Sequence, residues 1–430
     1  MNELRVLVFP CGTEIGLEIH SSLKFSNHIE LYGANSIPDH ARFVYKNYIE
    51  GVPFVDKPGF VGAIVKIVKD KKIDLIFPTH DSVVLKLARV KDKLGCRLIT
   101  SPLKTCEIAR SKKKTYEFFV KILRTPKVYQ PTDRNITFPV FLKPEVGQGT
   151  RGTFKANTKE DVEFYLKKDP TLMILEYLPG KEYTVDCFTD RHKELRFIGP
   201  RERTRIVNGI SVNSFPIKNP KIEEITKLIN DLLEFRGVWF FQVKEAKNGE
   251  LTLMEIAPRV GGTMGLTRNL GVNLPLLSVF DALDYDIEII KNKHYVEVER
   301  ALFSRFKTNL KFDHVYIDLD DTIFFKGKIN PWIIAFLYQC LNNNKKLHLL
   351  TRHPDTYREK TIKALKKLRI VEIFDEIIDV PKGKEKYEHI KDKNSIFIDD
   401  SFSERKKASD ALGIPAFDTH EIESLVDWKY

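Results

Sequence analysis

Acidic residues follow two apolar runs in the last third of the chain. Asp318 and Asp320 end the first run, and Asp399 ends the second, with Asp400 beside it. Carboxylates that emerge together at the ends of buried strands form Mg²⁺ sites, and a carboxylate can attack phosphorus. Asp318 is therefore the predicted nucleophile. Asp320, two residues along and on the same side, is the predicted proton donor to the leaving oxygen.

Two more side chains complete this predicted phosphate site. Thr351 ends another apolar run, where its hydroxyl can bond a phosphoryl oxygen. A lysine must offset the negative charge; Lys386, at the start of a predicted amphipathic helix, is the first candidate and Lys384 the second. The predicted metal ligands are Asp318, Asp320 and Asp399. One such residue alone is usually a strand-end turn residue or a solvated charge, but the full order indicates hydrolysis of a phosphate monoester.

The middle of the chain is suited to binding a nucleoside triphosphate. Lys143 ends a predicted strand and is placed to contact phosphates. The loop that follows contains Gly147, Gly149 and Gly152. These glycines allow the backbone to approach phosphates closely and to close as a lid, although a simple hairpin explains the loop equally well.

Carboxylates and arginines recur after the glycine loop. Glu176 follows an apolar strand whose end could offer backbone groups to adenine, and Glu182 could bind ribose hydroxyls; either acid alone is more often a surface residue. Glu255 lies between apolar neighbours on a strand, where a carboxylate usually has a cation partner. Arg203 and Arg259 are candidate anion clamps.

Alternating strand and helix patterns organise the chain around these residues. Strands at 4–9, 74–78 and 97–100, with helices near 58–70 and 81–93, are typical of a parallel α/β sheet, and this predicts a domain over 1–105. Residues 106–304 have an α+β pattern, 305–312 form a predicted linker, and 313–430 return to α/β alternation. The strands expected in the middle region are 139–143, 172–176, 182–188, 195–199, 238–244 and 251–256.

Composition limits the class of protein. The 430 residues allow two to four structural units, and 42% hydrophobic with 30% charged residues is ordinary for a soluble protein. No apolar run reaches membrane-spanning length and the start has no signal-peptide layout, so a cytoplasmic location is expected. The five cysteines lack metal or disulfide spacing and are expected to be reduced thiols. Cys11 is interpreted as a buried small residue, with a weak nucleophile as the alternative.

The chain has a formal charge of +11, from 70 basic and 59 acidic residues. Its lysines are spread along predicted helices, which favours solvated helix faces over a nucleic-acid surface. No nucleic-acid partner is therefore expected. A basic surface would still attract phosphorylated or carboxylated substrates.

The ordered motifs of the middle region resemble the ATP-grasp family, especially the branch similar to the carbamoyl-phosphate synthase large chain and to amino-acid ligases. The resemblance covers about residues 1–300 and implies a Rossmann-like domain before an ATP-grasp fold. It implies ATP contacts at Lys112, Lys143, the glycine loop, Glu176, Tyr177, Leu178 and Glu182, metal ligands at Gln242 and Glu255, and a phosphate contact at Arg259. The family usually has Asn where this chain has Ala257, so one metal ligand is lost and a two-metal arrangement is in doubt.

Residues 313–430 resemble the haloacid dehalogenase-like (HAD) phosphatase superfamily. The matching segments are Asp-Leu-Asp-Asp-Thr at 318–322 and Phe-Ile-Asp-Asp-Ser at 397–401. The resemblance implies a Rossmannoid fold. The short segment between the first motif and Thr351 leaves no room for a large cap domain, which implies an open, capless site for a bulky substrate or for the product of the neighbouring domain.

Together the resemblances imply a bifunctional enzyme that uses ATP and Mg²⁺. One half would join a small carboxylate to an amine through an acyl phosphate, and the other would remove a phosphate from the amine donor or the product. The alternatives are an ATP-grasp kinase and a regulatory metabolite-binding protein with degenerate sites. Glu14, His80 and Asp81, at strand–helix turns of the first domain, either face the substrate together with Arg203 or cap helices.

Overall fold

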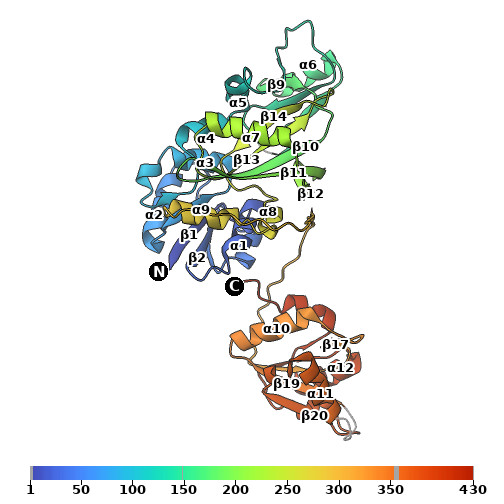
Figure 1. Cartoon of the computed structure of the whole chain (residues 1–430). Coiled ribbons are helices and arrows are strands. Elements are labelled where there is room, and N and C mark those ends of the chain that lie inside the picture. Colours follow the sequence, from blue (N-terminus) through green and yellow to red (C-terminus); the bar gives the residue numbers. More distant parts are fainter. Residues whose placement is uncertain (1–2, 148, 353–357, 430) are drawn as a thin grey trace. The chain divides into compact units, whose positions relative to one another are not determined.

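The computed structural model of the protein describes residues 3–147, 149–352 and 358–429. The chain divides into two compact units, Met1–Leu302 and Phe303–Tyr430 (Figure 1). The predicted boundary between residues 105 and 106 lies inside the first unit, and residues 305–312 contain no helix or strand. The finer division into three domains therefore stays a prediction.

The first unit begins with a five-stranded parallel sheet in the order β3-β2-β1-β4-β5. The buried residues of its central strand, β1, are all apolar. Such a continuous apolar run is expected for a parallel strand whose two faces are both covered by helices. The strands are β1 (Leu4–Phe9), β2 (Ile29–Ala34), β3 (Asn47–Ile49), β4 (Leu75–Pro78) and β5 (Arg97–Leu98). The helices are α1 (Glu14–Leu23), α2 (Phe60–Lys71) and α3 (Asp81–Ala88), followed by α4 (Leu103–Arg110) and α5 (Lys112–Phe119).

The order of this sheet reverses between β1 and β4, because the chain winds outward from β1 in one direction and from β4 in the other. Ligands of open α/β sheets bind at such a reversal, beside the carboxyl ends of the strands. The segments that follow β1 and β4 carry Glu14, His80 and Asp81. The topology therefore brings these three residues to one edge of the sheet.

Two antiparallel sheets complete the first unit. The smaller has the order β6-β9-β7-β8 and the larger β14-β13-β10-β11-β12-β15. The smaller consists of β6 (Val128–Tyr129), β7 (Val140–Pro144), β8 (Phe154–Ala156) and β9 (Leu172–Glu176), with helix α6 (Lys159–Lys168). The larger consists of β10 (Glu182–Thr189), β11 (Leu195–Val207), β12 (Ile210–Pro216), β13 (Gly237–Glu245), β14 (Leu251–Ala257) and β15 (Val298–Glu299), with helices α7 (Pro220–Leu232), α8 (Gly265–Asn269) and α9 (Leu274–Ala282).

Alternation along the central strands separates a core face from a polar face. Val185 and Phe241 are fully buried and join one apolar cluster with Ile222 and Ile229 of α7. Their neighbours one residue away point to the opposite face, because side chains alternate along a strand. Full burial of each of these apolar side chains contributes about 1.5–3 kcal/mol. The packing of α7 thus determines which face of the larger sheet remains available for a site.

The α/β and α+β patterns are confirmed, but several element bounds differ from those expected. The strand expected at 195–199 continues to Val207 as β11 and turns into β12, because Asn208 and Gly209 both adopt positive φ and form a tight hairpin. The helix expected at 81–93 ends at Ala88, and a short 3₁₀ turn, Lys91–Lys93, follows. Helix α4 was not expected.

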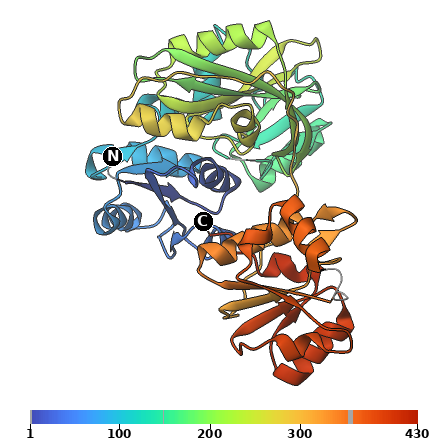
Figure 2. The same ribbon diagram turned by 60° about the horizontal axis from the view of Figure 1, so that its bottom comes forward.

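The second unit contains a parallel sheet with the same strand order as the first, β20-β19-β16-β21-β22. Figure 2 shows this unit from another side, with its helices around the strands of the sheet. The strands are β16 (His314–Ile317), β19 (Lys346–Thr351), β20 (Glu376–Asp379), β21 (Ser395–Ile398) and β22 (Ala416–Phe417), with the hairpin β17 (Phe324–Phe325) and β18 (Lys328–Ile329). The helices are α10 (Pro331–Asn342), α11 (Arg358–Leu368) and α12 (Phe402–Leu412).

None of the helices in the described residues has the length and apolar character needed to cross a membrane.

Candidate functional site

The register of the larger sheet lines up four polar side chains across four strands. Thr184 on β10 pairs with Arg201 on one side and with Gln242 on the other, and Gln242 pairs in turn with Glu255. Residues directly opposite one another in a sheet share a face. Gln242 and Glu255, the expected metal ligands of the first unit, are therefore adjacent, on the face away from α7.

A cavity of about 300 Å³ lies between the two antiparallel sheets. Most of the residues expected to contact ATP line it: Lys112, Lys143, Gly149, Glu176, Tyr177, Leu178 and Glu182. Arg203 and the expected metal ligands Gln242 and Glu255 line it as well. Its apolar wall includes Phe141, Leu178 and Met254. The arrangement can hold a flat apolar ring at one end and anionic groups at the other.

Two lysines supply the positive charge of this cavity. Burial lowers the pKa of Lys143 to about 8, although Glu255 and Glu182 act in the opposite direction. Burial likewise lowers the pKa of Lys112, against the charge of Glu255. A buried ammonium group gains most from an added anion, so these lysines favour a phosphate in the cavity.

The glycine loop connects β7 and β8, which pair as an antiparallel hairpin. Of the described loop residues, Gly149, Thr150 and Thr153 line the cavity, whereas Gly147 and Gly152 do not. Gly147 instead accepts a hydrogen bond from Lys112 Nζ through its carbonyl oxygen (3.4 Å). Gly209, at the tip of the β11–β12 hairpin, lies against this loop, and a Cβ there would come within 2.5 Å of the Thr150 backbone. The hairpin tip and the glycine loop therefore cover the cavity together.

A second cavity, of about 610 Å³, lies between the parallel sheet and the same polar face. Glu14, His80 and Asp81, the expected substrate contacts, line it together with Arg259. His80 also caps α3 by accepting a hydrogen bond from the Ser82 amide at 3.2 Å. The substrate and capping interpretations are thus compatible at this position.

Arg259 differs from the free anion clamp that the sequence suggested. Its Nε and Nη2 atoms donate to the two carboxylate oxygens of Asp81, at 2.5 and 2.8 Å. Its remaining nitrogen, Nη1, donates to the Val260 carbonyl at 3.1 Å. Burial by itself would raise the pKa of Asp81, but the charge of Arg259 outweighs it and lowers that pKa to about 2. The pair joins the edge of the parallel sheet to the segment after β14.

Asp81→Asn is expected to destabilise the first unit by about 3–5 kcal/mol at neutral pH, because Arg259 stays buried without its counter-charge. The pKa of Asp81 is lower in the folded than in the unfolded state. The stabilisation is therefore present above a pH of about 4 and disappears as pH falls toward 2. Urea unfolding should show that the difference in the free energy of unfolding between parent and variant becomes smaller as pH falls through that range. A difference in the free energy of unfolding that does not change with pH would contradict the ion pair. The control is Asp92→Asn, because Asp92 lies on an exposed turn.

Arg203 lines both cavities and is itself mostly buried. It forms an ion pair with Glu182 and donates to the Gly209 carbonyl at 2.9 Å. Its buried Nε atom has no hydrogen-bond partner within the described residues. An unsatisfied buried donor is costly, so a ligand acceptor at this point would stabilise the site.

Two more arginines of the second cavity were not singled out from the sequence. Arg201 is fully engaged by Asp186, with Nε–Oδ2 and Nη2–Oδ1 distances of 3.0 and 3.2 Å. Arg300 follows the two-residue strand β15 and donates to the Ser211 carbonyl at 3.2 Å. In the part of the chain that the structure describes, no carboxylate lies within ion-pair distance of Arg300. The short strand gave no motif by which Arg300 could have been found.

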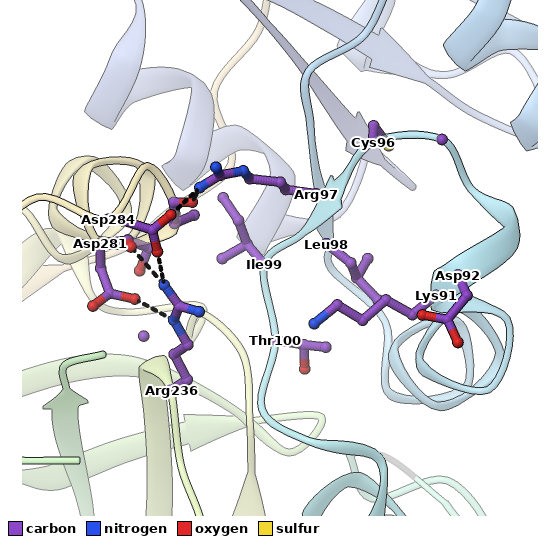
Figure 3. A pocket seen from close by; sticks show the side chains of 14 residues that line it. Lys91, Asp92, Cys96, Arg97, Leu98, Ile99, Thr100, Arg236, Asp281 and Asp284 are labelled. Carbon is purple, nitrogen blue, oxygen red and sulfur yellow. Dashed lines mark hydrogen bonds and ion pairs between the residues drawn. The ribbon is translucent and has the colours of Figure 1, made fainter. Parts of the chain in front are cut away.

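A third cavity, of about 400 Å³, has a different character (Figure 3). Arg236 donates to Asp281 and Asp284, and Arg97 pairs with Asp284, each at 2.9 Å. These charges cancel one another, and the network connects α9 to β5 and to the start of β13. It is a packing contact within the first unit rather than a site with unused chemistry.

Cys11 is fully buried, and burial raises the pKa of its thiol far above the ordinary range. Nucleophiles of this kind act as thiolates. The structure therefore favours the buried small residue over the nucleophile at this position.

In the second unit, the predicted phosphate residues gather at the carboxyl edge of the parallel sheet, beside the reversal between β16 and β21. Lys386 Nζ lies 2.7 Å from Asp318 Oδ1 and 2.6 Å from Asp399 Oδ2. Burial raises the pKa of Asp318 to about 7, with Lys386 opposing and Asp399 adding to the shift. Thr351 is buried at the end of β19. Two carboxylates around one lysine leave excess negative charge, which suits a divalent cation.

One expectation for this site needs correction. Lys386 opens a short 3₁₀ turn, Lys386–His389, and not an amphipathic helix. The exposed Lys384 lies 3.8 Å from Glu388, so Lys386 is the lysine that reaches the carboxylates. The carboxylates close enough to share a cation are Asp318, Asp399 and Asp400. Asp320 is exposed and lies outside this group of described side chains, and its role as a metal ligand stays a prediction.

Comparisons with known proteins concern mainly the first unit. Residues 168–302 match a family described as "ATP-grasp in the biosynthetic pathway with Ter operon". A D-alanine–D-alanine ligase of Fusobacterium nucleatum is 28% identical over 189 residues, which cover 41% of this chain and 66% of the ligase. A carbamoyl phosphate synthase large chain of Clostridium beijerinckii is 27% identical over 255 residues, which cover 51% of this chain and 23% of the synthase.

Solved structures show the same fold at low sequence identity. The biotin carboxylase domain of a Hydrogenobacter thermophilus 2-oxoglutarate carboxylase, determined with MgADP, ADP and bicarbonate, has a TM-score of 0.59 at 16% identity. The match covers 69% of this chain and 74% of that one. An L-amino acid ligase from Bacillus licheniformis has a TM-score of 0.54 at 15% identity, over 66% and 74% of the two chains.

Proposed function

Because the first unit carries an ATP-grasp region and has the fold of ATP-grasp structures, we propose that it is an ATP-dependent carboxylate–amine ligase. One observation carries this proposal. The cavity with the two lysines and the cavity with the arginines meet at Gln242 and Glu255, which line both. A phosphoryl group bound between them would be within reach of ligands in either cavity.

The residues of the first cavity fit ATP and Mg²⁺. Its apolar wall suits adenine, and Lys112 and Lys143 are placed for the phosphates. The side-chain oxygens of Gln242 and Glu255 would hold Mg²⁺, for which carboxylate and amide oxygens are suitable ligands. When bound, Mg²⁺ offsets the charge that develops on the transferred phosphoryl group.

The reaction proceeds in two displacements. An oxygen of the substrate carboxylate attacks the γ-phosphorus, the bond to the bridging oxygen breaks, and ADP leaves. The amine nitrogen then attacks the acyl carbon, inorganic phosphate leaves, and the nitrogen loses a proton to give the amide. Arg203 and Arg300 bind the carboxylate and, later, the acyl phosphate, because both arginines face the second cavity.

The second unit is proposed to hydrolyse a phosphate monoester in the manner of HAD phosphatases. Asp318 attacks phosphorus, and the leaving oxygen takes a proton from Asp320. Water then cleaves the aspartyl phosphate. Lys386 and Thr351 bind the phosphoryl oxygens, and Asp318 and Asp399, with Asp400 beside them, would hold Mg²⁺. The segment between β16 and β19 contains a small hairpin and α10, with no separate cap domain in the described residues.

A phosphate on the amine substrate or on the product would link the two activities. It gives a small molecule a strong handle for arginine, and its later removal makes the sequence of reactions effectively irreversible. The test is a screen of ADP release against a matrix of carboxylates and amines, with mass analysis of the products. ADP release that needs both partners supports the ligase. Release with one partner and a phosphorylated product favours a kinase, and no release with any pair would contradict both.

Arg300→Ala is expected to raise the KM for the carboxylate by about 10- to 100-fold, since a charge-assisted hydrogen bond contributes about 1.5–3 kcal/mol. The KM for ATP should stay unchanged, because Arg300 lines only the second of the two cavities. Steady-state kinetics with each substrate varied in turn separates these effects. Arg300→Lys should recover part of the loss. Arg134→Ala, on an exposed loop, is the control, and an equal change in both KM values would argue against a carboxylate contact.

A further inference from the structure

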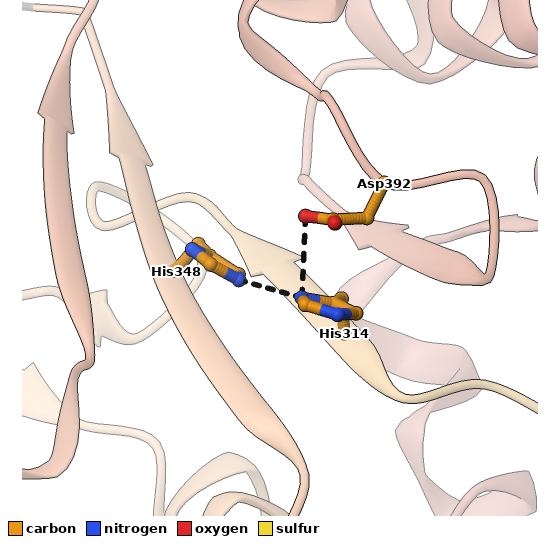
Figure 4. A group of neighbouring side chains, drawn as sticks. All are labelled: His314, His348 and Asp392. Atoms are coloured by element: carbon orange, nitrogen blue, oxygen red, sulfur yellow. Dashed lines mark hydrogen bonds and ion pairs between the residues drawn. The ribbon is translucent and has the colours of Figure 1, made fainter.

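A cluster of histidine and carboxylate side chains lies at the opposite end of β16 from Asp318 (Figure 4). His314 begins this strand, His348 comes from the neighbouring β19, and Asp392 lies in the segment before β21. His314 and Asp318 are four residues apart on an extended strand, which separates them by about 13 Å. The cluster is therefore distinct from the proposed phosphatase site.

Three potential ligand atoms converge in this cluster. His314 Nδ1 lies 3.0 Å from His348 Nε2 and 3.2 Å from Asp392 Oδ2. All three atoms lie within 4.8 Å of one another. Tetrahedral coordination with metal–ligand bonds of about 2.0–2.1 Å places neighbouring ligands about 3.3 Å apart. The distances of 3.0 and 3.2 Å from His314 Nδ1 to the other two atoms are close to this value.

Two further side chains, Glu376 and Tyr316, lie beside this cluster. The second ring nitrogen of His348, Nδ1, is buried and has no hydrogen-bond partner among the described residues, but Glu376 Oε2 lies 3.4 Å away. Glu376 is half exposed, so its carboxylate can move to accept the Nδ1 proton. Tyr316 donates a 2.6 Å hydrogen bond to Asp392 Oδ2. A carboxylate behind a ligating histidine fixes the tautomer that leaves Nε2 free for a metal.

Hydrogen bonding alone accounts less well for this geometry. In the tautomer of His348 that carries its proton on Nδ1, Nε2 has a lone pair and lies 3.0 Å from His314 Nδ1. A single proton on His314 Nδ1 would then have to serve both the imidazole and the carboxylate. A cation placed among the three atoms would satisfy all three lone pairs at once.

We propose that His314, His348 and Asp392 bind a divalent transition-metal ion of the zinc class, with water as a fourth ligand. Two imidazoles and one carboxylate are the ligands that Zn²⁺ accepts, whereas Mg²⁺ prefers oxygen alone. The bound ion would tie the start of β16 to the segment that follows Lys386. It would stabilise the second unit at the edge of the sheet opposite the phosphatase residues.

Metal binding by the full chain tests this proposal. The protein, stripped with chelator, is titrated with Zn²⁺ or Co²⁺ in excess Mg²⁺, which occupies the carboxylate site at the other edge. We expect one tight equivalent of Zn²⁺, a rise in the thermal midpoint, and a visible Co²⁺ absorption band of four-coordinate character. No tight equivalent and no such band in the parent chain would overturn the site.

Variants locate the ion. His314→Gln and Asp392→Asn should weaken Zn²⁺ binding by at least about tenfold, and Glu376→Gln and Tyr316→Phe by about 10- to 100-fold. The matched control is His420→Gln, because His420 is exposed in the same unit. Circular dichroism without metal checks that each variant is folded. Full binding in His314→Gln together with loss in Asp318→Asn would place the metal among the aspartates and overturn the proposal.

Discussion

Glu255→Gln is expected to reduce ATP-dependent ligation by about 10²–10³-fold while leaving the fold intact. Removing one electrostatic contact that acts in the transition state typically has this effect. Glu255 lies opposite Gln242 in the sheet and lines both cavities, so its carboxylate occupies the point where phosphoryl transfer would take place. Steady-state ADP release with a carboxylate and an amine measures the change. The reduction should appear in kcat more than in the KM for ATP.

Two controls make the result specific to Glu255. Glu224→Gln, on the exposed side of α7, makes the same chemical change outside the cavities and should ligate normally. Hydrolysis of a generic phosphate ester by Glu255→Gln should also persist, because Asp318 belongs to the other unit. Near-normal ligation by Glu255→Gln would remove Glu255 from the mechanism. Simultaneous loss of both activities would indicate a folding defect instead.

Asp318→Asn is expected to abolish hydrolysis of phosphate esters, with a loss of about 10⁴-fold or more, as for other enzymes that lose their nucleophile. The asparagine amide cannot act as the nucleophile toward phosphorus. Asp318 is the residue that directly follows β16, so the substitution removes the carboxylate from that position. ATP consumption by the first unit should continue. Ester hydrolysis is followed by phosphate release, and the ligation products by mass spectrometry.

The product that accumulates in Asp318→Asn gives the order of the two reactions. A phosphorylated amide places dephosphorylation after ligation. Ligation that stalls and resumes when dephosphorylated amine is added places it first. Asp410→Asn, on the exposed face of α12, is the matched control and should hydrolyse normally. Unchanged hydrolysis of every ester in Asp318→Asn would show that the proposed nucleophile is wrong.

Local sequence predicted the elements that carry most of the candidate residues. Lys143 and Glu255 stand on or at the end of apolar runs, and such runs form buried strands regardless of their partners. The same reasoning placed Asp318 and Asp399 at the ends of β16 and β21. Because parallel strands present their carboxyl ends at one edge, their proximity could be expected before the structure was known.

The sequence could not predict which charged side chains would be paired. Asp81 was a candidate for substrate binding and Arg259 for phosphate binding, yet they engage each other across 178 positions of sequence. Nothing in the local sequence shows whether Lys384 or Lys386 reaches the carboxylates. In the structure, Lys386 is buried between Asp318 and Asp399. Local patterns contain no information about such partners, because pairing depends on how distant elements pack.

By itself, the sequence determined that this chain has apolar strands ending in candidate phosphate-binding and metal-binding residues, and that parallel α/β regions flank an α+β region. The tertiary structure decided that Gln242 and Glu255 line two cavities at once, that Arg300 lines one of them, and that His314 and His348 meet beside Asp392. The physical reason is that periodicity sets the buried face of each strand locally. Register, strand order and the packing of separate sheets set distances between side chains, and these depend on the whole chain.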